Sequence, residues 1–170
     1  VNIETDTGQI VVVDTKAMKE VRRYKMIGCG APSGLAYDRR NNRLFSACGD
    51  TKTMAVSDPT SGKVVALIPI CTGTDAAAYD PALQLAFASC SDGTMTVVHQ
   101  DGPDKYTSLG NAATQRGSRT MGYDPRTHTA YLASVEYGPA PAPPTGGGRA
   151  GRAPMLPGTF AILVLEQQKK

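Results

Sequence analysis

Gly34-Leu35-Ala36-Tyr37-Asp38 is the first of three related phrases that decide the fold of this chain. The second is Ala76-Ala77-Ala78-Tyr79-Asp80, and the third is Thr120-Met121-Gly122-Tyr123-Asp124. Their aspartates lie 42 and 44 residues apart, and a short apolar strand follows each phrase. A period in the low forties with several strands in each unit is typical of a β-propeller.

Each unit is expected to hold four short strands joined by tight turns. The phrase itself is the first strand, and its Asp begins a polar turn, because Asp tolerates turn geometry and a following Pro presets φ. The remaining strands follow in order. We expect second strands at 44–47, 85–88 and 130–133, third strands at 54–57 and 95–98, and a fourth strand at 64–69 after the turn 58–63.

Both ends of the chain fit the same template from its interior. Residues 10–14 align with a third strand, 21–26 with a fourth, and 160–165 with another third. The expected fold is therefore all-β, an incomplete β-propeller ring of about 3.5 four-stranded antiparallel blades. The divisions are a partial blade at 1–27, blades at 28–70 and 71–114, and a partial blade at 115–170 with a Pro/Gly-rich insertion at 137–157.

The units resemble the YncE-like proteins, whose propeller repeats are of the YVTN type. Pro32-Ser33-Gly34-Leu35-Ala36-Tyr37-Asp38 is similar to the opening of that repeat, and Val12-Val13-Asp14-Thr15 to its closing phrase. No unit contains a literal Tyr-Val-Thr-Asn, and Thr74-Asp75-Ala76 replaces Pro-x-Gly in one unit. The resemblance implies a ring of about seven blades. We therefore expect a piece of a longer parent, the alternative being a short chain that closes its ring by oligomerising.

Four cysteines follow the register of the repeat. Cys29 and Cys71 are 42 residues apart, as are Cys48 and Cys90, and 19 residues separate the two cysteines within each unit. The end of one antiparallel strand lies beside the start of its partner, so we predict disulfides Cys29–Cys48 and Cys71–Cys90. Free buried thiols or a zinc or copper site are the alternatives, although no Cys-x-x-Cys is present. Disulfides favour a periplasmic or secreted protein.

Propellers bind ligands at the mouth of the central channel, where the loops that enter the innermost strands converge. Ser33, Asp75 and Arg119 occupy one equivalent position, one residue before each expected inner strand, and they differ between units. The guanidiniums of Arg116 and Arg119, on either side of Gly117, could bind a carboxylate or a phosphate through paired hydrogen bonds. Alternatively, Arg119 and Asp75 neutralise one another across neighbouring blades. The candidate ligand-binding residues are Ser33, Asp75, Arg116, Ser118 and Arg119.

The insertion at 137–157 interrupts the period. Its Pro and Gly content cannot sustain a helix or a strand, so we expect a mobile or partly extended loop. It is either a lid over the channel mouth, with Arg149 and Arg152 reaching an acidic partner, or a neutral surface insertion.

Composition argues against several classes of function. A net charge of +3 with no Trp does not favour nucleic-acid binding, and the longest apolar run, 160–165, is too short to span a membrane. The two histidines, His99 and His128, are expected at an exposed strand end and in an exposed outer turn. We therefore expect no catalytic residue, metal ligand or cofactor within this chain.

These observations predict an extracytoplasmic binding or scaffold module of YncE-like type. Its partner is a protein or a small anionic ligand at the channel mouth, and its ring needs the rest of the propeller or another subunit. The alternative is a propeller enzyme, either a lactonase-like hydrolase or a quinone- or metal-dependent oxidoreductase, whose remaining site residues lie on blades absent from this chain.

Overall fold

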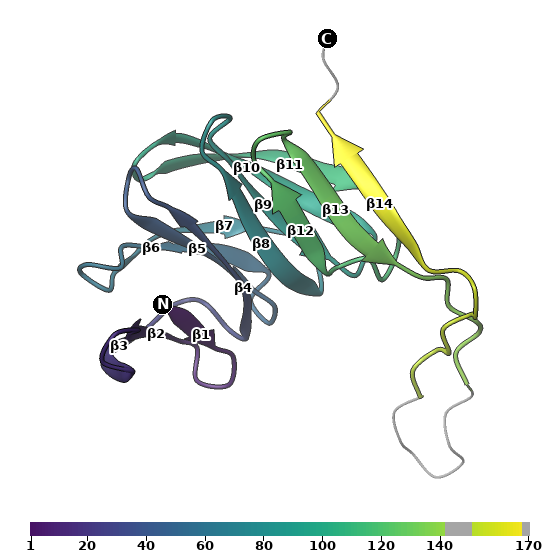
Figure 1. Ribbon diagram of the computed structural model, residues 1–170, viewed down its shortest axis with the longest axis horizontal. Helices are drawn as coiled ribbons and strands as arrows, with labels where there is room; N and C mark the ends of the chain where they lie inside the picture. Colours follow the sequence, from purple (N-terminus) through teal and green to yellow (C-terminus); the bar gives the residue numbers. More distant parts are fainter. Residues whose placement is uncertain (142–150, 168–170) are drawn as a thin grey trace.

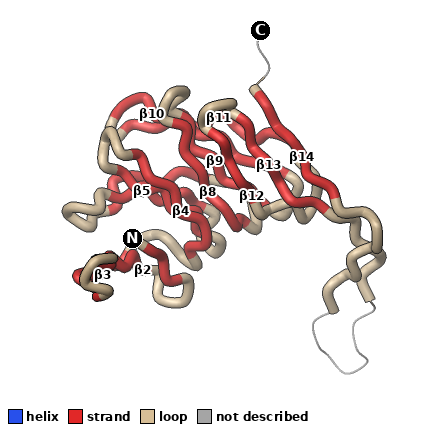
Figure 2. Tube along the Cα trace, viewed as in Figure 1, coloured by secondary structure: helices blue, strands red, loops and turns tan. Residues whose placement is uncertain are grey.

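The computed structural model describes residues 1–141 and 151–167, which form strands, turns and loops without a helix (Figure 2). These residues make four antiparallel sheets. Sheet 1 contains β1 (Asn2–Glu4), β2 (Gln9–Asp14) and β3 (Lys19–Lys25), and sheet 2 contains β4 (Pro32–Asp38), β5 (Arg43–Cys48), β6 (Thr53–Ser57) and β7 (Val64–Pro69). Sheet 3 contains β8 (Thr74–Asp80), β9 (Leu85–Cys90), β10 (Thr94–Gly102) and β11 (Lys105–Ala113), and sheet 4 contains β12 (Met121–Asp124), β13 (Thr129–Ser134) and β14 (Ala161–Glu166).

Every sheet is a meander, in which strands that follow one another in sequence are neighbours in space. Sheets 2 and 3 have four strands each, and the described parts of sheets 1 and 4 have three. The sheets follow one another across the molecule, with β14 at one edge and sheet 1 at the other (Figure 1). The fold is thus all-β and β-propeller-like.

The Asp of each phrase ends its strand by accepting hydrogen bonds from the turn that follows. Asp38 accepts from the Arg40 amide at 2.9 Å, and Asp124 accepts from the Arg126 amide at 2.9 Å. Asp80 does the same for two amides, at 2.9 and 3.0 Å. Each turn then passes through one left-handed residue. Those residues are Asn42, Gln84 and His128, with φ of 53°, 55° and 57°.

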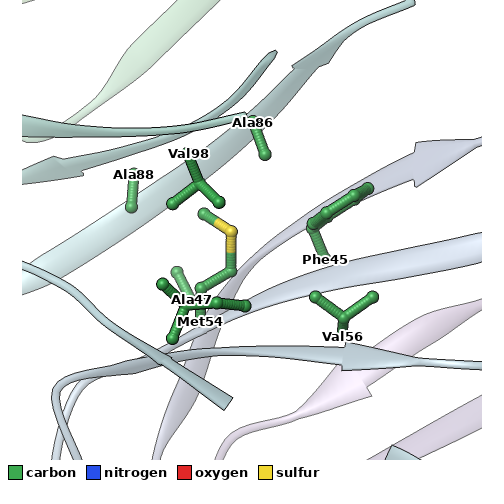
Figure 3. Packing of buried hydrophobic residues seen from close by; sticks show 8 residues of the cluster. Phe45, Ala47, Met54, Val56, Ala86, Ala88 and Val98 are labelled. Atoms are coloured by element: carbon green, nitrogen blue, oxygen red, sulfur yellow. The ribbon is translucent and has the colours of Figure 1, made fainter. Parts of the chain in front are cut away.

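Hydrophobic side chains fill the spaces between successive sheets. Phe45, Met54 and Val56 of sheet 2 face Ala86 and Val98 of sheet 3 (Figure 3). A second cluster joins sheets 1 and 2, and a third joins sheets 3 and 4. Each sheet is therefore held to its neighbour by apolar side chains, which is how the blades of a propeller pack.

The first strands of sheets 2 and 3 approach one another most closely at Gly34. A Cβ added there would lie 2.4 Å from the Ala77 amide nitrogen, so β4 can accept no side chain at this point. One residue earlier, Ser33 bulges out of the β4–β5 ladder, and Asp75 does the same in the β8–β9 ladder. The expectation that these two residues precede their strands is therefore wrong: both lie inside a strand, at a bulge.

Two further boundaries differ from expectation. β10 continues to Gly102, because two irregularities in its ladder allow it to stay paired with β11. β12 begins at Met121, so Arg119 lies two positions before its strand and not one.

Both predicted disulfides are present. Cys29–Cys48 and Cys71–Cys90 join Cα atoms that lie 5.3 and 5.9 Å apart. Each ties the loop before a first strand to the end of the second strand. Disulfides indicate an oxidising compartment. In residues 1–141 and 151–167, no helix has the length and apolar character needed to cross a membrane.

Candidate functional site

Loops that precede first strands and loops that follow second strands lie at the same end of their sheets, because neighbouring strands run antiparallel. We call this end the rim. The insertion between β13 and β14 leaves sheet 4 at the rim (Figure 1). The described rim loops are 5–8, 26–31, 49–52, 70–73, 91–93, 114–120, 135–141 and 151–160.

The rim of sheet 3 is held together by hydrogen bonds beside its disulfide. The Thr72 amide donates to Asp92 at 2.8 Å, and the Ser91 amide donates to the Gly73 carbonyl at 3.0 Å. Asp92 also accepts from the amide and hydroxyl of Thr94, at 3.0 and 2.7 Å. The two loops of this sheet consequently form one rigid wall.

A cleft of about 950 Å³ opens between this wall and the rim of sheet 4. We call it the rim cleft. The Gly117 amide closes its floor by donating to the Ser91 carbonyl at 2.9 Å, and the Tyr137 ring lies against Gly117. The cleft is lined by Thr72, Ser91, Asp92, Gln115, Arg116, Gly117, Val135, Glu136, Tyr137, Gly138, Ala140 and Ala153.

Arg116 carries the positive charge of the rim cleft. Its guanidinium is exposed and pairs with no carboxylate within the part of the chain that the structure describes. The lining contains two acidic residues. Asp92 accepts hydrogen bonds from Thr72 and Thr94, and Glu136 is exposed. The cleft therefore offers a cation, a tyrosine ring and several hydroxyl groups.

A smaller cleft of about 440 Å³ occupies the equivalent place between sheets 1 and 2. Its charged residues are both acidic, Asp6 and Asp50, and no Lys or Arg lines it. Structural groups such as the disulfide recur from unit to unit, whereas the charge of the cleft does not. This contrast distinguishes the rim cleft from its counterpart.

Of the predicted ligand-binding residues, only Arg116 lines the rim cleft. Ser118 is fully buried, and its hydroxyl has no hydrogen-bond partner among the residues that the structure describes. Ser33 donates to the Thr74 carbonyl at 3.2 Å, and Asp75 accepts from the Thr120 hydroxyl at 3.1 Å. These side chains therefore link neighbouring first strands.

The proposed neutralisation of Asp75 by Arg119 is absent from the ion pairs found among the described residues. Arg119 is exposed, and its carbonyl accepts a hydrogen bond from Ser89. Sequence reasoning missed Asp92 and Tyr137. The spacing of 42 residues between Asp50 and Asp92 is the one signal that marks any of them, because both follow a cysteine by two residues.

The described ends of the insertion pair with one another. Tyr137 forms an antiparallel bridge with Met155, and the Gly138 amide donates to the Pro154 carbonyl at 2.8 Å. The expected mobile loop is thus ordered at its base. Arg152 is exposed near that base, and Arg149 lies outside the described residues.

Both histidines contact carboxylates. His99 Nδ1 lies 2.7 Å from Asp101, and His128 Nδ1 lies 2.6 Å from Asp80, which is completely buried. The expectation of a merely exposed turn histidine is wrong for His128, because its turn folds against the turn of the preceding sheet.

One cluster of potential metal ligands occurs in the described residues, and it contains Cys71, Cys90 and Asp92. Both sulfur atoms are consumed by the disulfide, so the cluster offers a single carboxylate. It provides no basis for a metal centre.

No protein-family model matches the chain, and no curated protein matches it. Among solved structures, the chain is similar to hydrazine synthase of Kuenenia stuttgartiensis, with a TM-score of 0.66 and 14% sequence identity. The match covers 88% of this chain and 43% of that one, so this chain spans less than half the length of that protein. At this identity, the similarity concerns the fold alone.

Proposed function

We propose that the chain is part of an extracytoplasmic β-propeller of YncE-like type that binds an anionic ligand in the rim cleft. The observation that carries the proposal is Arg116, an exposed guanidinium without a carboxylate partner in the described residues, in a cleft of about 950 Å³. Ligand sites typically occupy clefts of about 300–1,000 Å³ with a few polar groups. The two disulfides support the extracytoplasmic setting.

The four sheets are blades of one ring in this proposal. About 3.5 blades fit the three phrases and the strands at both ends, and the remaining blades come from a longer chain or another subunit. Among residues 1–141 and 151–167, β14 pairs only with β13 and exposes apolar side chains on one face. This supports the proposal, because such edges are normally covered. The ring places the rim cleft beside the mouth of the channel.

The ligand is a carboxylate or a phosphate. A guanidinium binds both of these groups through paired N–H donors, and the neighbouring hydroxyls of Thr72 and Ser91 add neutral donors. Tyr137 supplies an apolar surface beside the charge. Glu136 disfavours large polyanions, so the proposal is confined to small ligands.

The experiment is calorimetric titration of the protein with citrate and with inorganic phosphate. We expect at least one of them to bind, with an affinity that falls as salt is added. Arg116→Gln should weaken binding about tenfold or more, since it removes a charged hydrogen bond.

Arg39→Gln is the matched control. Arg39 is also exposed but lies in the turn after β4, at the end of the sheet opposite the rim. Its replacement changes the net charge equally and should leave the affinity unchanged. Equal losses in the two variants, or no binding of either anion, would contradict the proposed site.

A further inference from the structure

A second cavity lies between sheets 3 and 4, reaching the end of the sheets opposite the rim. Its volume is about 420 Å³. It is independent of the rim cleft, because the two share no lining residue. Its walls are mostly apolar and include Leu83, Leu85, Phe87, Met95, Val97 and Leu165.

Small residues leave this space open. Gly110 of β11 has φ of +99° next to a break in the β10–β11 register, and a Cβ there would meet nothing within 4 Å. Ala112 and Ala130 line the cavity from β11 and β13. Larger side chains at these three positions would fill the volume, so the void follows from the sequence.

One wall of this cavity carries His128, whose ring contacts the Asp80 carboxylate behind the wall. Asp80 is completely buried and accepts hydrogen bonds from Tyr123 at 2.5 Å and from His128 Nδ1 at 2.6 Å. Burial raises the pKa of Asp80, but the hydrogen bonds from Tyr123, Leu83, His128 and Ala82 outweigh it and leave that pKa below its ordinary value.

The ionised Asp80 determines which nitrogen of His128 carries the proton. A carboxylate only accepts hydrogen bonds, so the proton of the neutral imidazole resides on Nδ1. Nε2 is then an acceptor, and His128 lines the cavity with its side chain 37% exposed. The cavity thus combines apolar walls with one hydrogen-bond acceptor that is held in place.

The remaining polar groups restrict the ligand's charge. Glu166 lines the cavity from the end of β14 and repels anions. An uncharged hydroxyl suits His128, because it donates a hydrogen bond to Nε2 without placing a negative charge beside Glu166.

We infer that this cavity binds a small, neutral, mostly apolar molecule with one hydroxyl group, such as a phenol, which donates its hydrogen bond to His128 Nε2. The Asp80 carboxylate holds the ring in the orientation that this bond requires. The site is separate from the rim cleft and takes ligands of different chemistry.

The test compares p-cresol with toluene, which has the same ring and methyl group but no hydroxyl. Binding is followed by NMR of protein with ¹⁵N-labelled histidine at pH 8. We expect p-cresol to shift the Nε2 resonance of His128 and to bind about tenfold more tightly than toluene, the value of one hydrogen bond.

Two variants separate the hydrogen bond from the apolar walls. His128→Leu should lower the affinity for p-cresol to that for toluene without weakening toluene binding. Ala130→Phe fills the cavity and should abolish both, with Leu83→Trp as the substitute if that variant does not fold. Binding of p-cresol that leaves the His128 resonances unmoved, equal affinities for the two ligands, or no binding would each overturn the inference.

Discussion

At the scale of the residue, the aspartates of the three phrases have one local role and one additional role. All three accept amides of the following turn, which explains their regular spacing. Asp80 alone also accepts from Tyr123 and His128 of the next sheet. It is therefore both the end of a strand and a bond between sheets 3 and 4.

Replacing Asp80 should cost more stability than replacing its equivalents. Asp80→Asn keeps the shape of the side chain but places an amide opposite donors, so we expect a loss of about 1–3 kcal/mol in the free energy of unfolding. Asp124→Asn is the control, because the side chain of Asp124 is 25% exposed and its ion-pair partner Arg126 is 87% exposed. Urea denaturation measures both, and equal effects would contradict the role between sheets.

The same residue predicts a pH dependence. The pKa of Asp80 in the folded protein lies below its ordinary value of 3.8, so its contribution is present above pH 3.8 and is lost as the pH falls through the folded pKa. The difference in stability between the wild type and Asp80→Asn should therefore shrink below pH 3.8. A difference that stays constant down to the acid limit of folding would exclude this linkage.

At the scale of the element, the disulfides and the close approach of first strands determine where the rim loops lie. Each disulfide joins the rim loop before a first strand to the end of a second strand. Gly34 permits β4 and β8 to lie side by side. The rim cleft depends on the Cys71–Cys90 disulfide, because this bridge ties together the two loops that form its wall in sheet 3.

Removal of the Cys71–Cys90 disulfide should destabilise the fold and loosen the rim cleft. The bridge closes a loop with a sequence separation of 19, worth about 3 kcal/mol in the chain-entropy model. We expect Cys71→Ser/Cys90→Ser to lower both the unfolding free energy and the anion affinity. Cys29→Ser/Cys48→Ser, which removes the bridge remote from the rim cleft, should lower the unfolding free energy alone. Loss of anion binding in both double variants would contradict the claim that the Cys71–Cys90 disulfide in particular shapes the rim cleft.

Gly34→Val should separate sheets 2 and 3. Its Cβ would meet the backbone of β8 at 2.4 Å, which no change of side-chain rotamer relieves, and we expect a loss of more than about 2 kcal/mol or failure to fold. Gly122→Ala, on β12 with nothing within 4 Å of its Cβ, should change the melting temperature little. Differential scanning calorimetry measures the melting temperatures of both variants. A stable Gly34→Val protein would show that β4 and β8 do not lie as described.

Prediction from the sequence succeeded where a physical signal repeats. The strands, their turns and the disulfide pairs follow from the period of the Tyr-Asp phrase and the cysteines. The site was harder to predict. Arg116 was singled out because two guanidiniums lie beside Gly117 in one loop, whereas Tyr137 lies in the insertion, outside the repeat. The His128–Asp80 bond joins residues 48 positions apart, and only the packing of two turns brings them together.

At the scale of the whole molecule, the described sheets leave an apolar surface at one side. Ile162 and Val164 of β14 are 49% and 57% exposed, and Tyr131 of β13 is 40% exposed on the same face. In the described residues β14 pairs only with β13. A free edge beside an apolar face is a site of association.

We therefore expect the 170-residue chain alone to associate. Light scattering after gel filtration should show a mass above that of the 17.9 kDa monomer. Ile162→Lys/Val164→Lys should shift the population toward monomer, since charges on an edge strand oppose pairing. Lys pairs placed on the already polar strand β3 are the control. A monomeric wild type would show that the exposed apolar surface of β13 and β14 does not mediate association.

The most direct test of the central claim is a backbone NMR titration of the ¹⁵N-labelled protein with citrate and phosphate. The claim is that one cleft at the rim, between sheets 3 and 4, binds a small anion through Arg116. The account predicts amide shifts confined to the loops around Thr72, Ser91, Arg116 and Tyr137, with none in the turns at the opposite end. Shifts spread over all exposed Lys and Arg residues, or centred on the cleft between sheets 1 and 2, would contradict it.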